Sequence, residues 1–416
     1  MPDSPSAPAA LSARHQGKTR AIALLAVAEI LAMALWFSSS AAIADMERQA
    51  PLTDAAKAML SSGVQAGFAI GAILYAVAGW ADRYDPRKVF AVSAAFAALA
   101  NALVLLAPIG SAGAIAARVL TGALMAGVYP VGVKIAVGWG QSDRGFLVGL
   151  LVGALTLGSA APHLIAYLGG ADWRIAVGGA SLLALLGAGL ALAIRLGPHH
   201  ASAPAFDAAA LRLAWRDERI RLAYAGYLGH MWELYVLWAW IGVALAASFS
   251  AQMAGEAALS SAKLAAFAVV AIGAVASIAA GKLADRIGKA ETTILAMIGS
   301  GSAAVAAALA YGGPPWLLIA IALVWGAFVI ADSAQFSALV ADYAPPERAG
   351  ALVTLQTALG FALTVVTVQL APWLAGWIGW PGVFLTLALG PLAGTLAMLR
   401  LKRLTAQARN PVKPNG

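Results

Sequence analysis

The stretch GKLADRIGK, residues 281–289, is a short charged segment between two long apolar runs. A degraded copy, AGWADRYDPRK at residues 78–88, places Asp82 203 residues before Asp285. A charged loop that recurs at half the chain length indicates a duplicated bundle of membrane helices.

Two further features repeat at nearly the same offset. Arg144 follows Asp143 at the start of one apolar run, and Arg348 follows Glu347 at the start of another, 204 residues later. Glu29 lies opposite Trp232 at the same spacing, one place from Glu233. Three coinciding offsets make an accidental match of the two halves improbable, so the sequence predicts an internal duplication.

The composition requires a lipid environment. Hydrophobic residues make up 61% of the 416 residues, charged residues 11%, and the mean hydropathy is +0.81. A soluble domain averages about 25% charged residues. The net charge of +8 does not indicate a nucleic-acid partner, because 21 of the 27 Lys and Arg residues fall in the tails and in alternate loops. This asymmetry follows the positive-inside rule and predicts that both termini are cytoplasmic.

Apolar runs of about 20 residues predict twelve membrane spans. The predicted spans are 21–43, 59–80, 89–108, 112–137, 145–168, 173–195, 221–247, 262–281, 291–311, 315–339, 349–371 and 379–400. The predicted organisation is an N-terminal tail (1–20), a first bundle (21–195), a linker (196–220), a second bundle (221–400) and a C-terminal tail (401–416). Residues 206–216 of the linker could form a short amphipathic helix on the membrane surface.

The repeated loop resembles the signature loop of the major facilitator superfamily, which each half of those transporters carries between its second and third helices. The resemblance implies an all-α membrane protein of twelve transmembrane helices in two pseudo-symmetric six-helix bundles that work by alternating access. It also implies a gating role for the charges of the repeated loops; a purely topogenic loop is the alternative. The gating residues predicted in this way are Asp82, Arg83, Asp285, Arg286, Arg144 and Arg348.

Ionisable residues inside the predicted spans need a reason, because each costs about 2.5–3.5 kcal/mol at the centre of a membrane helix. Arg118 followed by Gly122 resembles the superfamily's fourth-helix motif, and an acidic residue on the first helix accompanies it in proton-coupled members. Glu29 and Arg118 are therefore predicted to couple protons, with a structural ion pair as the alternative. Glu233 and Asp332 are predicted to share the coupling.

Aromatic and hydrogen-bonding residues on several spans predict a site for a solute. The seventh span is rich in aromatic residues around His230, which Glu233 follows by three positions and can meet; an interfacial aromatic belt is the alternative. Lys134 either faces the cavity or extends to the cytoplasm. The predicted substrate-binding residues are Trp36, Tyr129, Lys134, Tyr227, His230 and Gln356. Glu29, Arg118, His230, Glu233, Asp332 and Gln356 are expected to converge on a central cavity.

The predicted function is secondary transport of a small solute, first of all an organic anion moved with protons, across a bacterial inner membrane. Proton-driven export of an amphipathic compound and uncoupled uniport remain alternatives. The absence of cysteine excludes disulfides and thiolate chemistry, and no His/Glu spacing indicates a metal site, so an enzyme is not expected. The expected partners are the solute, protons and the lipid bilayer, with no cofactor and no nucleic acid; the protein is expected to be a monomer.

Overall fold

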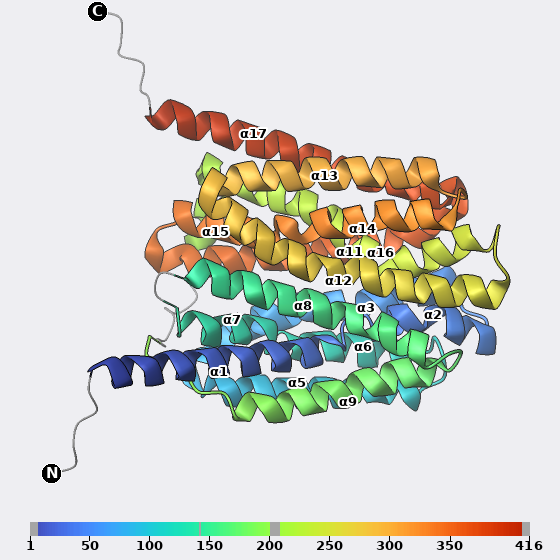
Figure 1. The fold of residues 1–416 in the computed structure, drawn as a ribbon, viewed down its shortest axis with the longest axis horizontal. Helices are drawn as coiled ribbons and strands as arrows, with labels where there is room; N and C mark the ends of the chain where they lie inside the picture. Colours follow the sequence, from blue (N-terminus) through green and yellow to red (C-terminus); the bar gives the residue numbers. More distant parts are fainter. Residues whose placement is uncertain (1–6, 141–142, 200–208, 410–416) are drawn as a thin grey trace, which may run out of the picture.

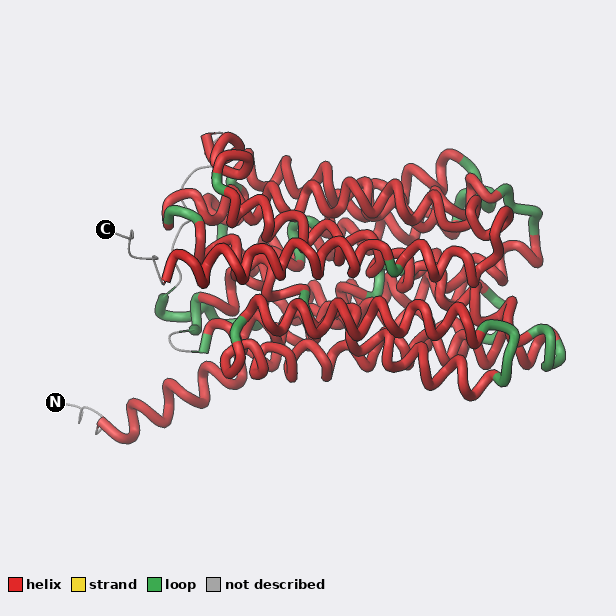
Figure 2. The backbone as a smooth tube through the Cα atoms, turned by 90° about the horizontal axis from the view of Figure 1, so that it is seen from above, coloured by secondary structure: helices red, strands yellow, loops and turns green. Residues whose placement is uncertain are grey.

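The computed structural model describes residues 7–140, 143–199 and 209–409. These residues form a bundle of long helices that run side by side, and both ends of the described chain lie at the same end of the bundle (Figure 1). We call this the terminal end, and the other the opposite end. The first turns of α1 extend out of the bundle at the terminal end (Figure 2).

The first six passes are built from ten helical segments. They are α1 (Ala7–Met33), α2 (Ser38–Gln49), α3 (Asp54–Ala78), α4 (Trp80–Arg83), α5 (Pro86–Ala102), η1 (Leu103–Leu105), α6 (Ala112–Met125), α7 (Tyr129–Val137), α8 (Arg144–Leu168) and α9 (Trp173–Leu192). The first helix therefore begins at Ala7, within the predicted tail.

The linker and the last six passes contain eight helices. They are α10 (Ala209–Arg216), α11 (Glu218–Phe249), α12 (Gly255–Ile287), α13 (Lys289–Ala310), α14 (Pro315–Ala331), α15 (Ser333–Tyr343), α16 (Pro346–Leu387) and α17 (Leu389–Arg409). The short linker helix predicted within 206–216 is present as α10, and residues 206–208 lie outside the described residues.

Twelve passes result, as the sequence predicts. Eleven stretches of the described chain are long and apolar enough to span a membrane, and the last of them, Pro346–Gln407, contains 62 residues. A straight helix of that length would be about 93 Å long, three times the thickness of a hydrocarbon core. The chain instead turns back at Gly379, whose φ of 69° and ψ of 170° are not helical, and so supplies two passes.

Within the described residues, four passes are interrupted between their ends. The first breaks at residues 34–37 between α1 and α2, the fourth at 126–128 between α6 and α7, the tenth at Asp332 between α14 and α15, and the twelfth at Ala388 between α16 and α17. A break leaves backbone groups without helical partners, which lipid cannot satisfy. Such breaks are tolerated only where protein or a cavity surrounds them, so they mark the region where a site is expected.

Small residues let α3 and α6 pack backbone to backbone. A Cβ atom on Gly67 would lie 1.9 Å from the Val119 carbonyl oxygen, and one on Gly122 would lie 2.0 Å from the Val64 carbonyl oxygen. Helices in lipid gain most of their association energy from this kind of close contact. The small-residue spacing of the sequence thus forms a packing seam within the first half. Between the halves, α8 packs on α12 and α3 on α16.

Gly67→Ala is expected to destabilise the protein by about 3 kcal/mol or more, because the methyl group meets backbone that cannot move aside. The measurement is the midpoint of thermal unfolding in detergent. Gly189→Ala is the matched control, since a Cβ atom on this glycine of α9 meets nothing within 4 Å. Equal midpoints for the two variants would contradict the packing argument.

Candidate functional site: a cavity between the two halves

A cavity of about 420 Å³ lies between the two halves. Its lining comes from both: Trp36, Tyr129 and Val152 belong to the first half, and Tyr227 and Thr357 to the second. The cavity extends from the middle of the bundle to Ala81 and Asp82, at the terminal end. Three of the predicted substrate-binding residues, Trp36, Tyr129 and Tyr227, therefore line one cavity.

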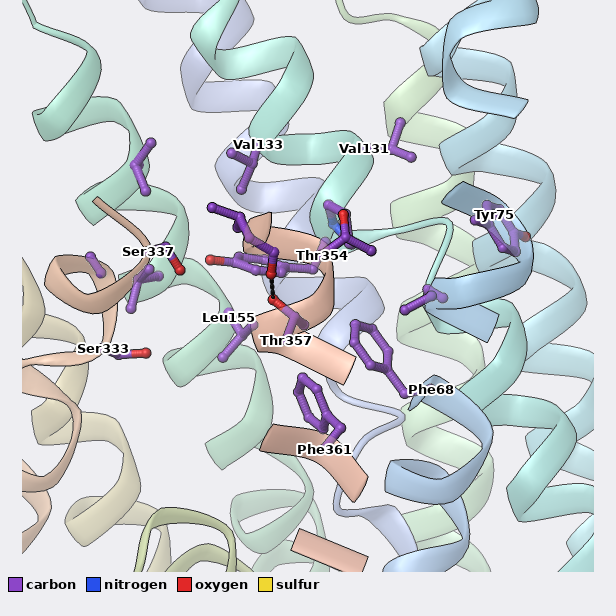
Figure 3. Close-up of a pocket in the computed structure, with 18 of the residues that line it drawn as sticks. Phe68, Tyr75, Val131, Val133, Leu155, Ser333, Ser337, Thr354, Thr357 and Phe361 are labelled. Atoms are coloured by element: carbon purple, nitrogen blue, oxygen red, sulfur yellow. Dashed lines mark hydrogen bonds between the residues drawn. The ribbon is translucent and has the colours of Figure 1, made fainter. Parts of the chain in front are cut away.

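An aromatic cluster closes the cavity toward the opposite end. Ring centroids are 4.4 Å apart for Phe68 and Phe361, 5.0 Å for Trp36 and Phe68, and 5.1 Å for Tyr235 and Phe361. Phe68 on α3 and Phe361 on α16 approach each other from the two halves (Figure 3). Aromatic pairs at these separations attract one another beyond the burial of their area, so the cluster holds the halves together at mid-depth.

The two walls of the cavity differ in polarity. The wall from the second half carries four serine and threonine side chains, Ser333, Ser337, Thr354 and Thr357, on α15 and α16 (Figure 3), beside the phenols of Tyr227 and Tyr235. The facing wall from the first half contains no serine or threonine; it is mainly aliphatic, and its polar groups are the phenols of Tyr75 and Tyr129 and the carboxylate of Asp82. A solute in the cavity therefore meets one face rich in hydroxyl groups and one that is mainly apolar.

Arg118 is fully buried and donates hydrogen bonds to backbone carbonyls at the break in the first pass. Its Nη1 donates to the Leu35 carbonyl at 3.0 Å and its Nη2 to the Trp36 carbonyl at 2.6 Å. Nη1 also donates to Ser38 Oγ and to Asn101 Oδ1. The cation therefore caps the carboxyl end of α1, where the helix dipole is negative. This contact accounts for a buried arginine without an acidic partner.

Glu29 is also fully buried, but neither carboxylate oxygen has a hydrogen-bond partner. Its Oε2 lies against α7, where a Cβ atom on Gly132 would be 2.6 Å away. The Glu29–Arg118 contact that the sequence allows is not formed, since the guanidinium is occupied by the break between α1 and α2. Within the part of the chain that the structure describes, Glu29 is the buried carboxylate with both oxygens unpartnered.

The acidic groups of the second half form a cluster behind the cavity wall. His230 Nδ1 lies 2.8 Å from Asp332 Oδ1, a distance typical of an ion pair, although the contact lacks the geometry of a hydrogen bond. Glu233 accepts hydrogen bonds from Ser300 at 2.9 Å and from Trp325 at 2.6 Å. The predicted partner of His230 on the same helix is therefore replaced by Asp332 on the tenth pass.

The residues expected to converge on the cavity lie outside its lining: most of them contact neighbouring helices, and Glu29 is buried without a partner. None of the six residues expected there is part of its lining; they are Glu29, Arg118, His230, Glu233, Asp332 and Gln356. Gln356 accepts a hydrogen bond from Ser337 at 3.4 Å and lies behind it. Which of these residues move protons stays a prediction.

Comparison with known proteins agrees with this architecture. A family model described as Major Facilitator Superfamily matches residues 25–259 and 225–415. The chain belongs to the major facilitator superfamily. Its fold is similar to the crystal structure of a point mutant of the nucleoside transporter NupG, with a TM-score of 0.68 and 15% identity over 92% of this chain and 99% of the other.

Two xylose transporters are also similar in fold. A D-xylose–proton symporter gives a TM-score of 0.70 at 15% identity, over 92% of this chain and 97% of the other. The xylose transporter XylE from E. coli, in a partially occluded inward open conformation, gives 0.68 at 15% identity, over 91% and 98%. Comparison with curated proteins gives no match. The family match and these structures together show the fold of the superfamily.

The two signature loops of this superfamily member have diverged. In the first, Lys134 donates to the Ala81 carbonyl at 2.7 Å and forms an ion pair with Asp82. Asp85 accepts from the backbone N–H of Arg87 and pairs with its guanidinium, which holds the pKa of the Asp85 carboxyl below its usual value. In the second loop Asp285 and Arg286 are exposed. Lys134 thus neither faces the cavity freely nor extends to solvent: it holds the first loop.

The other loop charges lie at the terminal end with little burial. Arg83 and Arg144 are exposed, and Arg348 is half-buried. Arg144 donates to the Gly140 carbonyl at 3.3 Å within its own half. A gating role for these residues stays a prediction.

A buried ion pair between the halves was not anticipated from the sequence. Lys263 on α12 contacts Asp45 on α2 at 2.6 Å and donates to the Gly170 carbonyl at 2.6 Å. The two side chains are 8% and 1% exposed. Near this end Gln369 also donates to Ser62 at 3.2 Å across the halves. We call the Asp45–Lys263 contact the latch. Only the position of each charge near the end of a span could have suggested it.

Proposed function

We propose that the protein is a proton-coupled secondary transporter in a bacterial cytoplasmic membrane, with both termini in the cytoplasm. The main observation that supports this proposal is the cavity between the halves, which is closed at the opposite end by the aromatic cluster and extends to the terminal end. With the terminal end cytoplasmic, as the distribution of Lys and Arg favours, this is an inward-facing conformation. Alternating access then requires the latch to open and the terminal end to close.

The contacts of the basic side chains weaken the prediction of an organic anion. The side chains among the predicted site residues that could offset the charge of an anion are Arg118, Lys134 and His230. Arg118 is occupied by carbonyl oxygens and Lys134 by Asp82, while His230 lies beside Asp332. A buried anion needs a cation or several donors to offset its desolvation. These side chains already have partners within the protein, so they are not available to a solute.

Glu29 and Asp332 are the best-supported proton-coupling residues. An ionised carboxylate without partners in the interior is strongly unfavourable, so Glu29 can remain where it is by holding a proton. Asp332 lies at the break of the tenth pass beside His230, where a change of protonation alters an ion pair at a hinge. The similarity in fold to a proton symporter supports the same proposal, and uncoupled uniport is the alternative.

The coupling is tested without knowing the solute. Ser337→Cys places a thiol on the cavity wall of a chain that has no cysteine of its own. In proteoliposomes, the rate of labelling by a membrane-impermeant maleimide is divided by the rate for a free thiol at the same pH, because the thiolate is the reactive form. This ratio is expected to depend on pH, and Glu29→Gln or Asp332→Asn is expected to reduce that dependence at least threefold. Glu347→Gln, at an exposed position in the first turn of α16, is the control.

The possible outcomes distinguish a failure of the transport proposal from a wrong choice of proton-coupling residues. Labelling that never changes with pH or with an imposed pH gradient would argue against alternating access coupled to protons. A pH dependence that survives in both variants would leave transport standing and show that other residues carry the proton.

A further inference from the structure

We propose that the cavity binds an uncharged solute that has an apolar ring face and a hydrogen-bonding edge. This inference rests on the proposed transport function and specifies the chemical class of its substrate. It is carried by three properties of the lining: the absence of a usable charge, the position of the hydroxyl groups, and the aromatic closed end.

The lining carries no charge that a solute could use. Among the residues that line the cavity, none is Lys, Arg or His, and the one carboxylate, Asp82, is already paired with Lys134 at the mouth. An ion that left water for this cavity would lose its hydration without gaining a counter-ion, a cost that a neutral group does not meet. The cavity therefore selects against anions and cations alike.

The hydroxyl wall presents mainly acceptors. Thr354 donates its hydroxyl hydrogen to the Gly350 carbonyl at 3.0 Å, and Thr357 donates to the Val353 carbonyl at 2.9 Å, both within α16. The Thr357 hydroxyl is also in hydrogen-bond contact with the Tyr227 phenol. The lone pairs of the Thr354 oxygen remain available, so the solute must supply a donor on that side. The edge of the solute that faces α15 and α16 therefore carries at least one donor group.

The closed end accepts a ring. Phe68, Phe361, Trp36 and Tyr235 contact one another there, opposite the aliphatic wall of the first half. Flat apolar groups stack on such surfaces, and a cavity of about 420 Å³ falls in the range of small-molecule sites. A ring at the closed end and hydroxyl, amide or similar neutral groups against α15 and α16 satisfy all three properties at once.

The test uses probes that differ in charge and in hydrogen bonding but share one skeleton. Phenylpropanol, phenylpropanamide, phenylpropanoate and phenylpropylamine are added at millimolar concentration to the purified full-length protein, and the Tm is measured. The alcohol and the amide are expected to raise the Tm in a dose-dependent way. The carboxylate and the amine are expected to have no effect, and the methyl ether of the alcohol, which cannot donate, a smaller one.

A variant locates the binding site. Thr354→Val is expected to weaken the apparent affinity for the alcohol about fivefold, the effect of one lost hydrogen bond. Thr364→Val is the matched control: Thr364 also donates to a carbonyl of α16, at 2.8 Å from Phe361, but it does not line the cavity. Equal affinities in the two variants would overturn the assignment of the site.

A Tm raised by the carboxylate or the amine rather than by the neutral probes would overturn the proposed class, as would no response to any neutral probe. Neither result would affect the pH-dependent labelling that tests transport. Conversely, binding of the alcohol by a protein whose cavity never alternates would uphold the class and refute the transport proposal.

Discussion

Arg118→Ala is expected to cost the protein about 3–5 kcal/mol of stability, the range for a buried charge removed from its partners. The loss is large because several acceptors depend on one side chain. The Trp36 carbonyl would be left in the bundle interior without a donor, and the Leu35 carbonyl and Asn101 Oδ1 would keep only the contacts from Ser38. Neither water nor lipid can replace that donor at this depth.

The measurement is the midpoint of thermal unfolding after extraction in detergent, together with the yield of monodisperse protein. Arg118→Lys keeps the charge but offers fewer directed donors, so it is expected to fall between wild type and Arg118→Ala and to fold even if the alanine variant does not. Arg174→Ala is the control, because Arg174 is exposed. A wild-type midpoint for both Arg118 variants would refute the structural role and strengthen the predicted role in proton coupling.

Removing the latch is expected to shift the conformational equilibrium by about two to three orders of magnitude toward the state open at the opposite end. Lys263→Met leaves Asp45 buried without its cation, and breaking one partner of a buried pair costs about 3–5 kcal/mol. The penalty applies only while that end is closed, because opening exposes Asp45 to water. Every 1.4 kcal/mol changes an equilibrium constant tenfold.

Spin labels on Ala171 and Ala257 report this change, since both residues are exposed and lie on different halves near the latch. The distance distribution is expected to lengthen in Lys263→Met and in Asp45→Asn. Lys57→Met is the matched control: Lys57 pairs with Glu47 at 2.8 Å within the first half and cannot hold the halves together. An unchanged distribution in the latch variants would show that the aromatic cluster alone keeps this end closed.

The number and order of the passes could be predicted because hydropathy is a local property of the sequence. In lipid, a long apolar segment must also form a helix, since its backbone N–H and C=O groups can be paired only within the segment. The side-chain partners could not be predicted. Lys263 and Asp45 are 218 residues apart in the chain, and their contact depends on how two helices are rotated and tilted. Sequence periodicity restricts that rotation only weakly when most faces are apolar.

The backbone breaks show the same limit. The break in the fourth pass lies at Gly127 and just before Pro130, two residues that commonly interrupt helices. The break in the first pass falls on Ala34, Leu35, Trp36 and Phe37, which carry no such signal. Because Arg118 stabilises that break, its role could not be recognised while the first pass was taken as a continuous helix. The fourth-helix resemblance singled out Arg118 but could not reveal its acceptors.

The break in the first pass also has a mechanical consequence. With 12 residues, α2 is a rod of only about 18 Å, and Asp45 near its far end is held by the second half. When Asp45 is displaced, the short helix α2 rotates about the break at Leu35 and Trp36, and the rest of the pass need not tilt with it. The segment that carries Glu29 is on the other side of the break. A displacement of Asp45 reaches the segment of Glu29 through the break at Leu35 and Trp36, where the Arg118 guanidinium is bound to both carbonyls.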